Sequence, residues 1–291
     1  PARQRMATTV PDGLAEEVRH IQATYGVVGR DHEIAQALAC LRAQRDLLIE
    51  GPVGVGKTWL AQALARHLDR PFFRVDGDER YTEQKLVGWF DPPIVLRTGY
   101  TREAFVPGPL TEAMQASGIL FINELNRMPE SAQNVLLPCL DERLVVIPRL
   151  GPVRAASGFL VVATQNPQEF VATSHLSEAL RDRFELLRLG YQSLEEEVRI
   201  VRQATGVEDE ELCRRAVLAV RASREHSQVK RGASVRAAIS AVRIASELGG
   251  ADHLLAAARL AFPTRIELRE DATKSLDEVI RELVEGGEKK G

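Results

Sequence analysis

The stretch Gly51-Pro52-Val53-Gly54-Val55-Gly56-Lys57-Thr58 has the form of a loop that binds a polyphosphate. Glycines let the backbone bend so that successive N–H groups point at phosphate oxygens, Lys57 supplies a positive charge for the β- and γ-phosphates, and Thr58 supplies a hydroxyl for Mg²⁺. A short apolar run precedes the loop, and leucines recur after it at four-residue spacing. This pattern predicts a strand, a loop and a helix that bind a nucleoside triphosphate.

Four further apolar runs follow, each separated from the next by helical or loop sequence: residues 72–75, 119–122, 159–163 and 184–189. Strands that alternate with helices predict an α/β fold, a mostly parallel five-stranded sheet covered on both faces, with the ligand at the carboxyl ends of its strands. After about residue 190 apolar residues recur at spacings of three and four, which predicts helices. We expect a nucleotide-binding core over residues 1–190 and a small all-helical domain over residues 191–291.

Composition and charge are those of an ordinary globular protein. Of the 291 residues 44% are hydrophobic, and 38 basic against 41 acidic side chains leave a net charge of −3. The chain thus lacks the excess of basic residues that nonspecific DNA binding needs, so nucleic acid is not an expected partner. No apolar stretch approaches the ~20 residues that span a bilayer, and the three cysteines lack metal-ligand spacing. We expect a cytoplasmic protein with no membrane span and no metal other than the Mg²⁺ of the nucleotide.

The third apolar run predicts a buried strand that delivers two polar side chains, Asn123 and Glu124, at its carboxyl end. Nucleotide sites of this kind usually have an Asp here, which anchors the Mg²⁺ shell, and a Glu, which orients the attacking water. Asn123 keeps an acceptor oxygen but lacks the charge, so it would hold Mg²⁺ only indirectly and leave more of the task to Thr58. Hydrolysis could be slow. Without the phosphate loop, an ordinary strand end would be the simpler interpretation.

Several later residues could contact the phosphates. Asn166, in Gln165-Asn166-Pro167 at the end of a strand, is a candidate sensor of the γ-phosphate, although Asn-Pro alone is a common turn. Arg181 and Arg183, just before the fifth strand, are either solvated surface or supply a guanidinium that enters the site of a neighbouring subunit. Ser234 is predicted to cap a helix whose first turn carries Arg236 beside free backbone N–H groups, where a phosphate contact is possible.

Taken in order, these elements resemble an AAA+ ATPase, and specifically the MoxR type within the group that carries an insert in the second core helix. The resemblance covers nearly the whole chain. The motifs that carry the resemblance are Val28-Gly29-Arg30, Gly108-Pro109-Leu110, residues 123–129, residues 163–167, Asp182-Arg183-Phe184 and residues 232–236. The Gln-Asn-Pro element and the Ser-x-Arg start of a helix are the more specific signs.

The resemblance implies ATP and Mg²⁺ as ligands and a role for each candidate residue. Residues 51–58 would bind the phosphates, with Lys57 and Thr58 on the phosphates and Mg²⁺, and Val28 would lie at the adenine side. Glu124 would be the catalytic base, Asn166 the first sensor, Arg183 the finger that acts in trans, and Arg236 the second sensor. It also implies a homo-oligomeric ring, commonly a hexamer, that remodels or matures client protein complexes, often beside a partner with a von Willebrand factor A domain.

Several alternatives stay open at this stage. Because Asn123 departs from the expected Asp, the protein could be a nucleotide-dependent switch or scaffold with weak hydrolysis. A DNA-acting relative of the same group is a third possibility, which the acidic pI disfavours, and a small P-loop kinase a fourth. The insert predicts a hairpin over residues 92–107 with strands at 94–96 and 105–106, and a second hairpin is predicted over 143–155. Each hairpin either contacts a client or packs between subunits.

Overall fold

The computed structural model describes residues 10–166 and 176–288. Contacts divide the chain into two compact units: the first runs up to Pro52 and from Gly56 to Gly190, and the second comprises residues 53–55 and the chain from Tyr191 onward. Each unit has a hydrophobic core of its own. Their roles as an AAA+ core and a lid stay a prediction.

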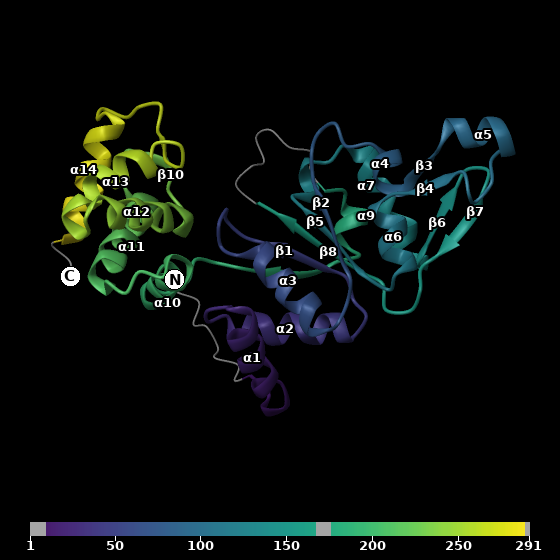
Figure 1. Ribbon diagram of the computed structural model, residues 1–291, viewed down its shortest axis with the longest axis horizontal. Coiled ribbons are helices and arrows are strands. Elements are labelled where there is room, and N and C mark those ends of the chain that lie inside the picture. The colour runs from purple at the N-terminus through teal and green to yellow at the C-terminus, as the bar shows by residue number, and fades with distance from the viewer. Residues whose placement is uncertain (1–9, 167–175, 289–291) are drawn as a thin grey trace. The chain divides into compact units, whose positions relative to one another are not determined.

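A five-stranded sheet forms the centre of the first unit (Figure 1), in the order β2-β5-β8-β1-β9 and with every neighbouring pair parallel. The strands are β1 (Leu47–Glu50), β2 (Phe72–Asp76), β5 (Ile119–Asn123), β8 (Leu160–Gln165) and β9 (Glu185–Arg188). Nearly every residue of β5 and β8 is buried, as expected where helices cover both faces of a sheet. The predicted parallel sheet of five strands is confirmed.

Helices pack on this sheet along the whole first unit. Of these, α2 contacts β1 and β9, α3 contacts β5 and β8, and α6 contacts β2 and β5. The helices are α1 (Asp12–Tyr25), α2 (Asp31–Arg42), α3 (Lys57–His67), α4 (Glu83–Val87), α6 (Pro109–Gln115), α7 (Glu130–Asn134), α8 (Leu136–Glu142) and α9 (Glu178–Arg181), with a 3₁₀ turn η1 (Leu125–Arg127).

The first predicted hairpin exists, but one of its strands was assigned to the wrong residues. Strand β4 (Phe105–Pro107) pairs with β3 (Gly88–Phe90), whereas residues 94–96 lie in a helix, α5 (Pro92–Thr98). The Asp91 side chain accepts a hydrogen bond from the Ile94 N–H at 3.2 Å, and Pro92 occupies the first turn. An N-cap acid followed by proline starts a helix, and this local signal overrides the strand propensity of the apolar run.

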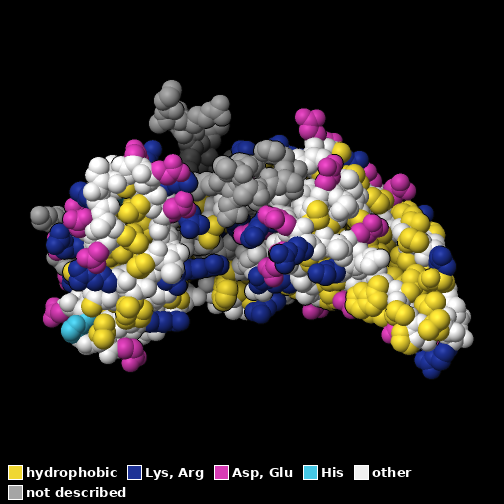
Figure 2. Space-filling view, turned by 90° about the horizontal axis from the view of Figure 1, so that it is seen from above, with side chains coloured by type: hydrophobic (Ala, Val, Ile, Leu, Met, Phe, Trp, Pro, Cys, Tyr) yellow, Lys and Arg dark blue, Asp and Glu magenta, His cyan; other side chains and the backbone are white. Residues whose placement is uncertain are grey.

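The second predicted hairpin is confirmed as β6 (Leu144–Ile147) paired with β7 (Gly151–Arg154). Its turn contacts the first hairpin region, since the Arg149 guanidinium lies 4.0 Å from the centre of the Tyr100 ring. Hydrophobic side chains gather on the surface at this end of the first unit (Figure 2). Those exposed there include Trp89, Leu96 and Val146, and Leu96 is 89% exposed. A role for this surface at a client or between subunits stays a prediction.

The second unit is helical, as predicted, with one addition. Its helices are α10 (Leu194–Thr205), α11 (Glu210–Glu225), α12 (Val235–Leu248), α13 (Leu254–Ala261) and α14 (Leu276–Glu288), with a 3₁₀ turn η3 (Ala251–His253). A two-stranded antiparallel ribbon of β10 (Val229–Arg231) and β11 (Glu267–Leu268) was not expected from the sequence. Among the described residues, no helix is both long and apolar enough to cross a membrane.

Candidate nucleotide site

The predicted phosphate loop lies between β1 and α3, at the carboxyl edge of the sheet. Gly54 and Gly56 have φ values of 81° and 90°, which residues with a side chain rarely adopt, and Gly56 is the N-cap of α3. The helix N-terminus therefore opens directly onto the loop, where free N–H groups and the helix dipole favour an anion.

The cation of the loop is kept close to the backbone that would cradle the phosphates. The Lys57 ammonium group donates to the carbonyl oxygens of Gly51 at 2.5 Å and Pro52 at 3.0 Å. Thr58 follows as the second residue of α3, and its side chain is half-buried. Val55 is buried and Val53 exposed. Glycines at positive φ, an N-terminal helix turn, a lysine and a threonine hydroxyl together fit a nucleotide polyphosphate with its magnesium ion.

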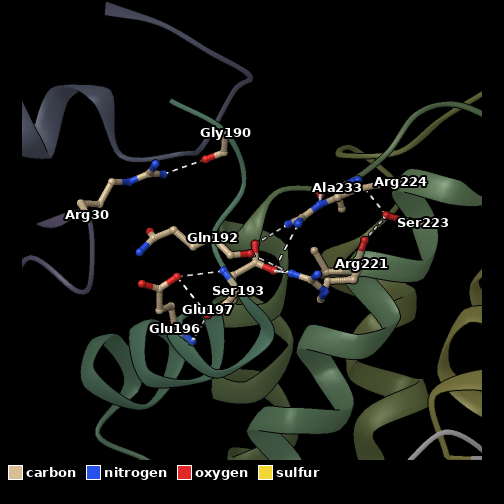
Figure 3. Close-up of polar contacts among 11 residues, drawn as sticks. Arg30, Gly190, Gln192, Ser193, Glu196, Glu197, Arg221, Ser223, Arg224 and Ala233 are labelled. Carbon is tan, nitrogen blue, oxygen red and sulfur yellow. Dashed lines mark hydrogen bonds and ion pairs between the residues drawn. The ribbon is translucent and has the colours of Figure 1, made fainter. Parts of the chain in front are cut away.

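The segment predicted to meet the adenine lies between α1 and α2. Val28 is half-buried there, and Arg30 fixes the end of the segment. The Arg30 side chain is 9% exposed and donates from Nη2 to the Gly190 carbonyl at 2.8 Å (Figure 3), and it also pairs with Glu33 at 3.2 Å. This contact ties the Val28 segment to the last residue of the first unit.

Asn123 is the last residue of β5 and Glu124 follows it; β8 lies between β5 and β1, the strand that leads into the loop. Glu124 has φ 57° and ψ 53°, a left-handed conformation that is unusual for a residue with a side chain. Its N–H donates to Thr164 Oγ1 at 2.9 Å, and its carboxylate pairs with Arg127 at 2.9 Å. The candidate base is thus held by both its backbone and its side chain.

The predicted first sensor follows β8. Asn166 is 4% exposed, and β8 lies between β5 and β1, the arrangement on which its predicted contact with the γ-phosphate depends. Pro167, the next residue of the motif, lies outside the described residues. Since parallel strands end at one edge of a sheet, the candidates Lys57, Thr58, Asn123, Glu124 and Asn166 all lie at the carboxyl edge of the first unit.

Arg183 lies elsewhere. It precedes β9, whose residue Glu185 is in register with Leu47 at the beginning of β1, so Arg183 is at the amino edge of the sheet. Its guanidinium binds the Asp141 carboxylate on α8 with two hydrogen bonds of 2.6 Å, and it also contacts the Ala179 carbonyl. This ion pair holds the pKa of Asp141 below its usual value.

Arg236 belongs to the second unit, where it is exposed in the first turn of α12. Ser234 occupies the predicted N-cap position, but its side chain makes no capping hydrogen bond. The loop is fixed instead by α11 (Figure 3): Arg224 Nε donates to the Ala233 carbonyl at 3.0 Å, and the Ala233 N–H donates to Ser223 Oγ at 2.9 Å.

The sequence analysis assigned no individual role to three neighbours of Asn123 and Glu124. Asp76 is the last residue of β2 and is in register with Asn123. Gly77 donates its N–H to the Asn123 carbonyl at 2.7 Å. Thr164 lies on β8, the strand next to β5. A signal was present for Asp76, because the apolar run 72–75 was predicted as a strand and Asp76 is the polar residue at its carboxyl end. Within the described ranges, no group of three or more His, Cys, Asp or Glu side chains could hold a metal ion.

Comparison with known proteins identifies the family of the chain. A family model described as an AAA domain of the dynein-related subfamily matches residues 46–184. The uncharacterised protein YojN of Bacillus subtilis is 30% identical over 253 residues, which cover 84% of this chain and 82% of YojN. The gas vesicle ATPase GvpN of Haloferax mediterranei is 32% identical over 213 residues, or 68% of this chain and 61% of that protein.

Two solved structures share the fold. A candidate ATPase from Cytophaga hutchinsonii superposes with a TM-score of 0.53 at 23% identity and covers 94% of both chains. A variant of RuvB from Thermotoga maritima gives a TM-score of 0.55 at 17% identity, over 80% of this chain and 71% of RuvB. At these identities the likeness concerns the fold alone.

The loop between β1 and α3 and the polar strand ends beside it define a P-loop nucleoside triphosphatase. With its relatives, the chain belongs to the AAA+ ATPases and is of the MoxR type. As a member of this family it binds nucleotide and is an ATP hydrolase.

Proposed function

We propose that the protein works as a homo-oligomeric ring, commonly a hexamer in its family, which couples ATP hydrolysis to the remodelling or maturation of client protein complexes. A partner with a von Willebrand factor A domain is proposed on the same family grounds. Mg²⁺ would accompany the nucleotide and neutralise charge that develops on the phosphates. Thr58 and, indirectly, Asn123 would hold it, since hydroxyl, amide and carboxylate oxygens are the donors that Mg²⁺ prefers.

The position of Arg183 carries the proposal of an oligomer. Arg183 lies about six residues behind the phosphate loop along the strand direction, given the register of β9 with β1, or roughly 20 Å at ~3.3 Å per residue. An arginine side chain does not span that distance, so Arg183 cannot stabilise the transition state in its own subunit. A ring, in which the amino edge of one sheet faces the carboxyl edge of the next, gives this arginine a phosphate to contact.

The remaining roles stand as proposals for single residues. Glu124 acts as general base toward the attacking water, Asn166 contacts the γ-phosphate or that water, and Arg236 acts as the second sensor. Val28 borders the adenine. Lys57 moves from the Gly51 and Pro52 carbonyls, where it now lies, onto the phosphates.

Steady-state ATP turnover per subunit, measured against protein concentration, tests the proposal. Turnover per subunit should fall as dilution dissociates the ring, and Arg183→Ala should lower it by roughly 10³-fold with unchanged ATP affinity. Arg181→Ala is the matched control, because Arg181 is an exposed arginine two residues earlier, and its turnover should stay within about twofold of wild type. Turnover that is independent of concentration, or an active Arg183→Ala variant, would contradict a site completed by the neighbour.

The alternatives are not favoured. A switch or scaffold with hardly any hydrolysis rests on Asn123 alone, against relatives that carry the name ATPase. A DNA-acting role would rest on RuvB, whose likeness at 17% identity concerns the fold, and the net charge of −3 speaks against it.

A further inference from the structure

A chain of hydrogen bonds joins the ends of three strands around Asn123. The Asn123 Nδ2 group donates to Asp76 Oδ1 at 3.0 Å, and Asn123 Oδ1 accepts from Thr164 Oγ1 at 3.1 Å. Thr164 Oγ1 in turn accepts from the Glu124 N–H at 2.9 Å. The chain therefore runs from β2 through β5 to β8 and ends on the backbone of the candidate base.

This arrangement fixes which end of the Asn123 amide faces the nucleotide. An ionised carboxylate can only accept hydrogen bonds, so the NH₂ group must lie toward Asp76 on β2. The amide oxygen then lies toward β8, and beyond β8 in the sheet is β1, which leads into the phosphate loop. A carbonyl oxygen has a second lone pair besides the one that Thr164 uses, and that pair can accept from a water bound to a cation.

The orientation matters because an amide has one acceptor oxygen and one NH₂ donor group, whereas a carboxylate has two acceptor oxygens. If Asn123 rotated by half a turn, it would present NH₂ protons to a divalent cation. An Asp at this position needs no such control, because its two oxygens are equivalent. With Asn123 in place of the usual Asp, the site thus needs a group that fixes the orientation of the amide, and β2 can supply it.

Asp76 is itself held in place. Arg74 donates to both of its oxygens, at 2.7 Å to Oδ1 and 3.0 Å to Oδ2. Since Arg74 balances the charge of Asp76, Asp76 acts on Asn123 as a hydrogen-bond acceptor rather than as a free anion. The strand ends also approach closely, because the Gly77 N–H donates to the Asn123 carbonyl at 2.7 Å.

We propose that Asp76 is a positioning residue of the magnesium–nucleotide site, which keeps the oxygen of Asn123 rather than its NH₂ turned toward the metal. This inference rests on the proposed role of Asn123. Through Asp76, β2 then contributes to the site that the strands β1, β5 and β8 form with the phosphate loop.

The test measures ATP binding by calorimetry, with Mg²⁺ and again with EDTA, and needs no turnover. Asp76→Ala should weaken binding of Mg²⁺–ATP about 10-fold, as the loss of a partner that orients a metal ligand usually does, and leave binding in EDTA unchanged. The unchanged value in EDTA also shows that the variant is folded. Asp78→Ala is the control, since Asp78 is an exposed acid two residues away whose carboxylate accepts from the Arg80 N–H, and it should match wild type under both conditions.

Exchanging the two side chains gives the second arm. Asn123→Asp alone would set two carboxylates against each other across the strand pair, so it should not tighten Mg²⁺–ATP binding. The double variant Asp76→Asn with Asn123→Asp restores a donor facing a carboxylate and should bind Mg²⁺–ATP at least as tightly as wild type.

Equal Mg²⁺–ATP affinities of Asp76→Ala and wild type, or effects of the two exchange substitutions that simply add, would overturn the inference and leave the proposed function standing. Wild-type protein that binds no ATP under either condition would instead remove the proposed function itself.

Discussion

At the scale of single residues, the backbone of Glu124 adopts a left-handed conformation that is unusual for a residue with a side chain. A left-handed conformation costs a residue with a side chain about 1 kcal/mol or more, and here it is held by hydrogen bonds to Thr164 and from the Arg127 N–H. Gly77 leaves room for it: a Cβ added there would lie 2.2 Å from the Glu124 carbonyl oxygen. The glycine is therefore required by the position of the candidate base.

Replacing Gly77 with alanine tests this requirement. The new methyl group must displace the Glu124 carbonyl, and a shift of about 1 Å in a catalytic group can cost roughly 10²-fold in rate. We expect single-turnover hydrolysis to slow by about that factor while ATP affinity is retained. Gly13→Ala is the control, because a Cβ at Gly13 in α1 meets nothing within 4 Å. Hydrolysis at the wild-type rate in Gly77→Ala would show that Glu124 does not depend on this close approach.

At the scale of elements, a buried ion cluster joins α10 to α11 in the second unit (Figure 3). Glu197 is 3% exposed and pairs with Arg224 at 2.8 Å and with Arg221 at 2.9 Å. The Arg224 guanidinium also lies 3.7 Å from the centre of the Tyr191 ring and binds the Ala233 carbonyl. The cluster thus connects the first residue after Gly190 with the loop that leads into the helix of Arg236.

Glu197→Ala should destabilise the second unit strongly, because it leaves the largely buried Arg224 without its carboxylate. Removing one partner of a buried pair typically costs about 3–5 kcal/mol, and urea denaturation followed by circular dichroism measures the loss. Glu195→Ala is the matched control: Glu195 pairs with Arg214 at 3.2 Å, but the Glu195 side chain is 68% exposed and that of Arg214 41%, and pairs near the surface contribute about 1 kcal/mol or less. Comparable losses in the two variants would show that burial of Glu197 is not what makes its pair important.

Elements also show where sequence reasoning works and where it stops. The strands of the central sheet were predicted because strands buried on both faces are continuous apolar runs, and the loop residues because each has a chemical task. Residues 94–96 were assigned to a strand because a run of three apolar residues is too short to show whether its periodicity is that of a strand or a helix. The structure has a helix there, which the Asp91 N-cap starts. The β10–β11 ribbon was not predicted because strands of two or three residues are too short to show an alternation of apolar and polar residues. Asp76 follows a predicted strand in the sequence, but only its register with Asn123 shows that the two side chains meet.

At the scale of the whole molecule, the proposed roles divide between the two edges of the sheet. The phosphate loop is at the carboxyl edge, and Arg183 is at the amino edge with Asp141. If Arg183 has the role proposed above, a single chain has a phosphate loop that lacks its arginine. In the proposed ring, head-to-tail association of identical subunits would place Arg183 of each subunit at the loop of the next.

Mixing two inactive variants tests this division directly. Lys57→Ala subunits lack the cation for the phosphates but keep Arg183, whereas Arg183→Ala subunits keep the loop, so each variant alone should hardly hydrolyse ATP. In rings formed at random from equal amounts, about one interface in four joins an intact loop to an intact finger, so activity should recover to about a quarter of wild type. Mixing Arg183→Ala with a Lys57→Ala/Arg183→Ala double variant is the control and should recover nothing. If mixed rings form, as native mass spectrometry can establish, and still fail to hydrolyse ATP, then Arg183 does not act across the subunit boundary.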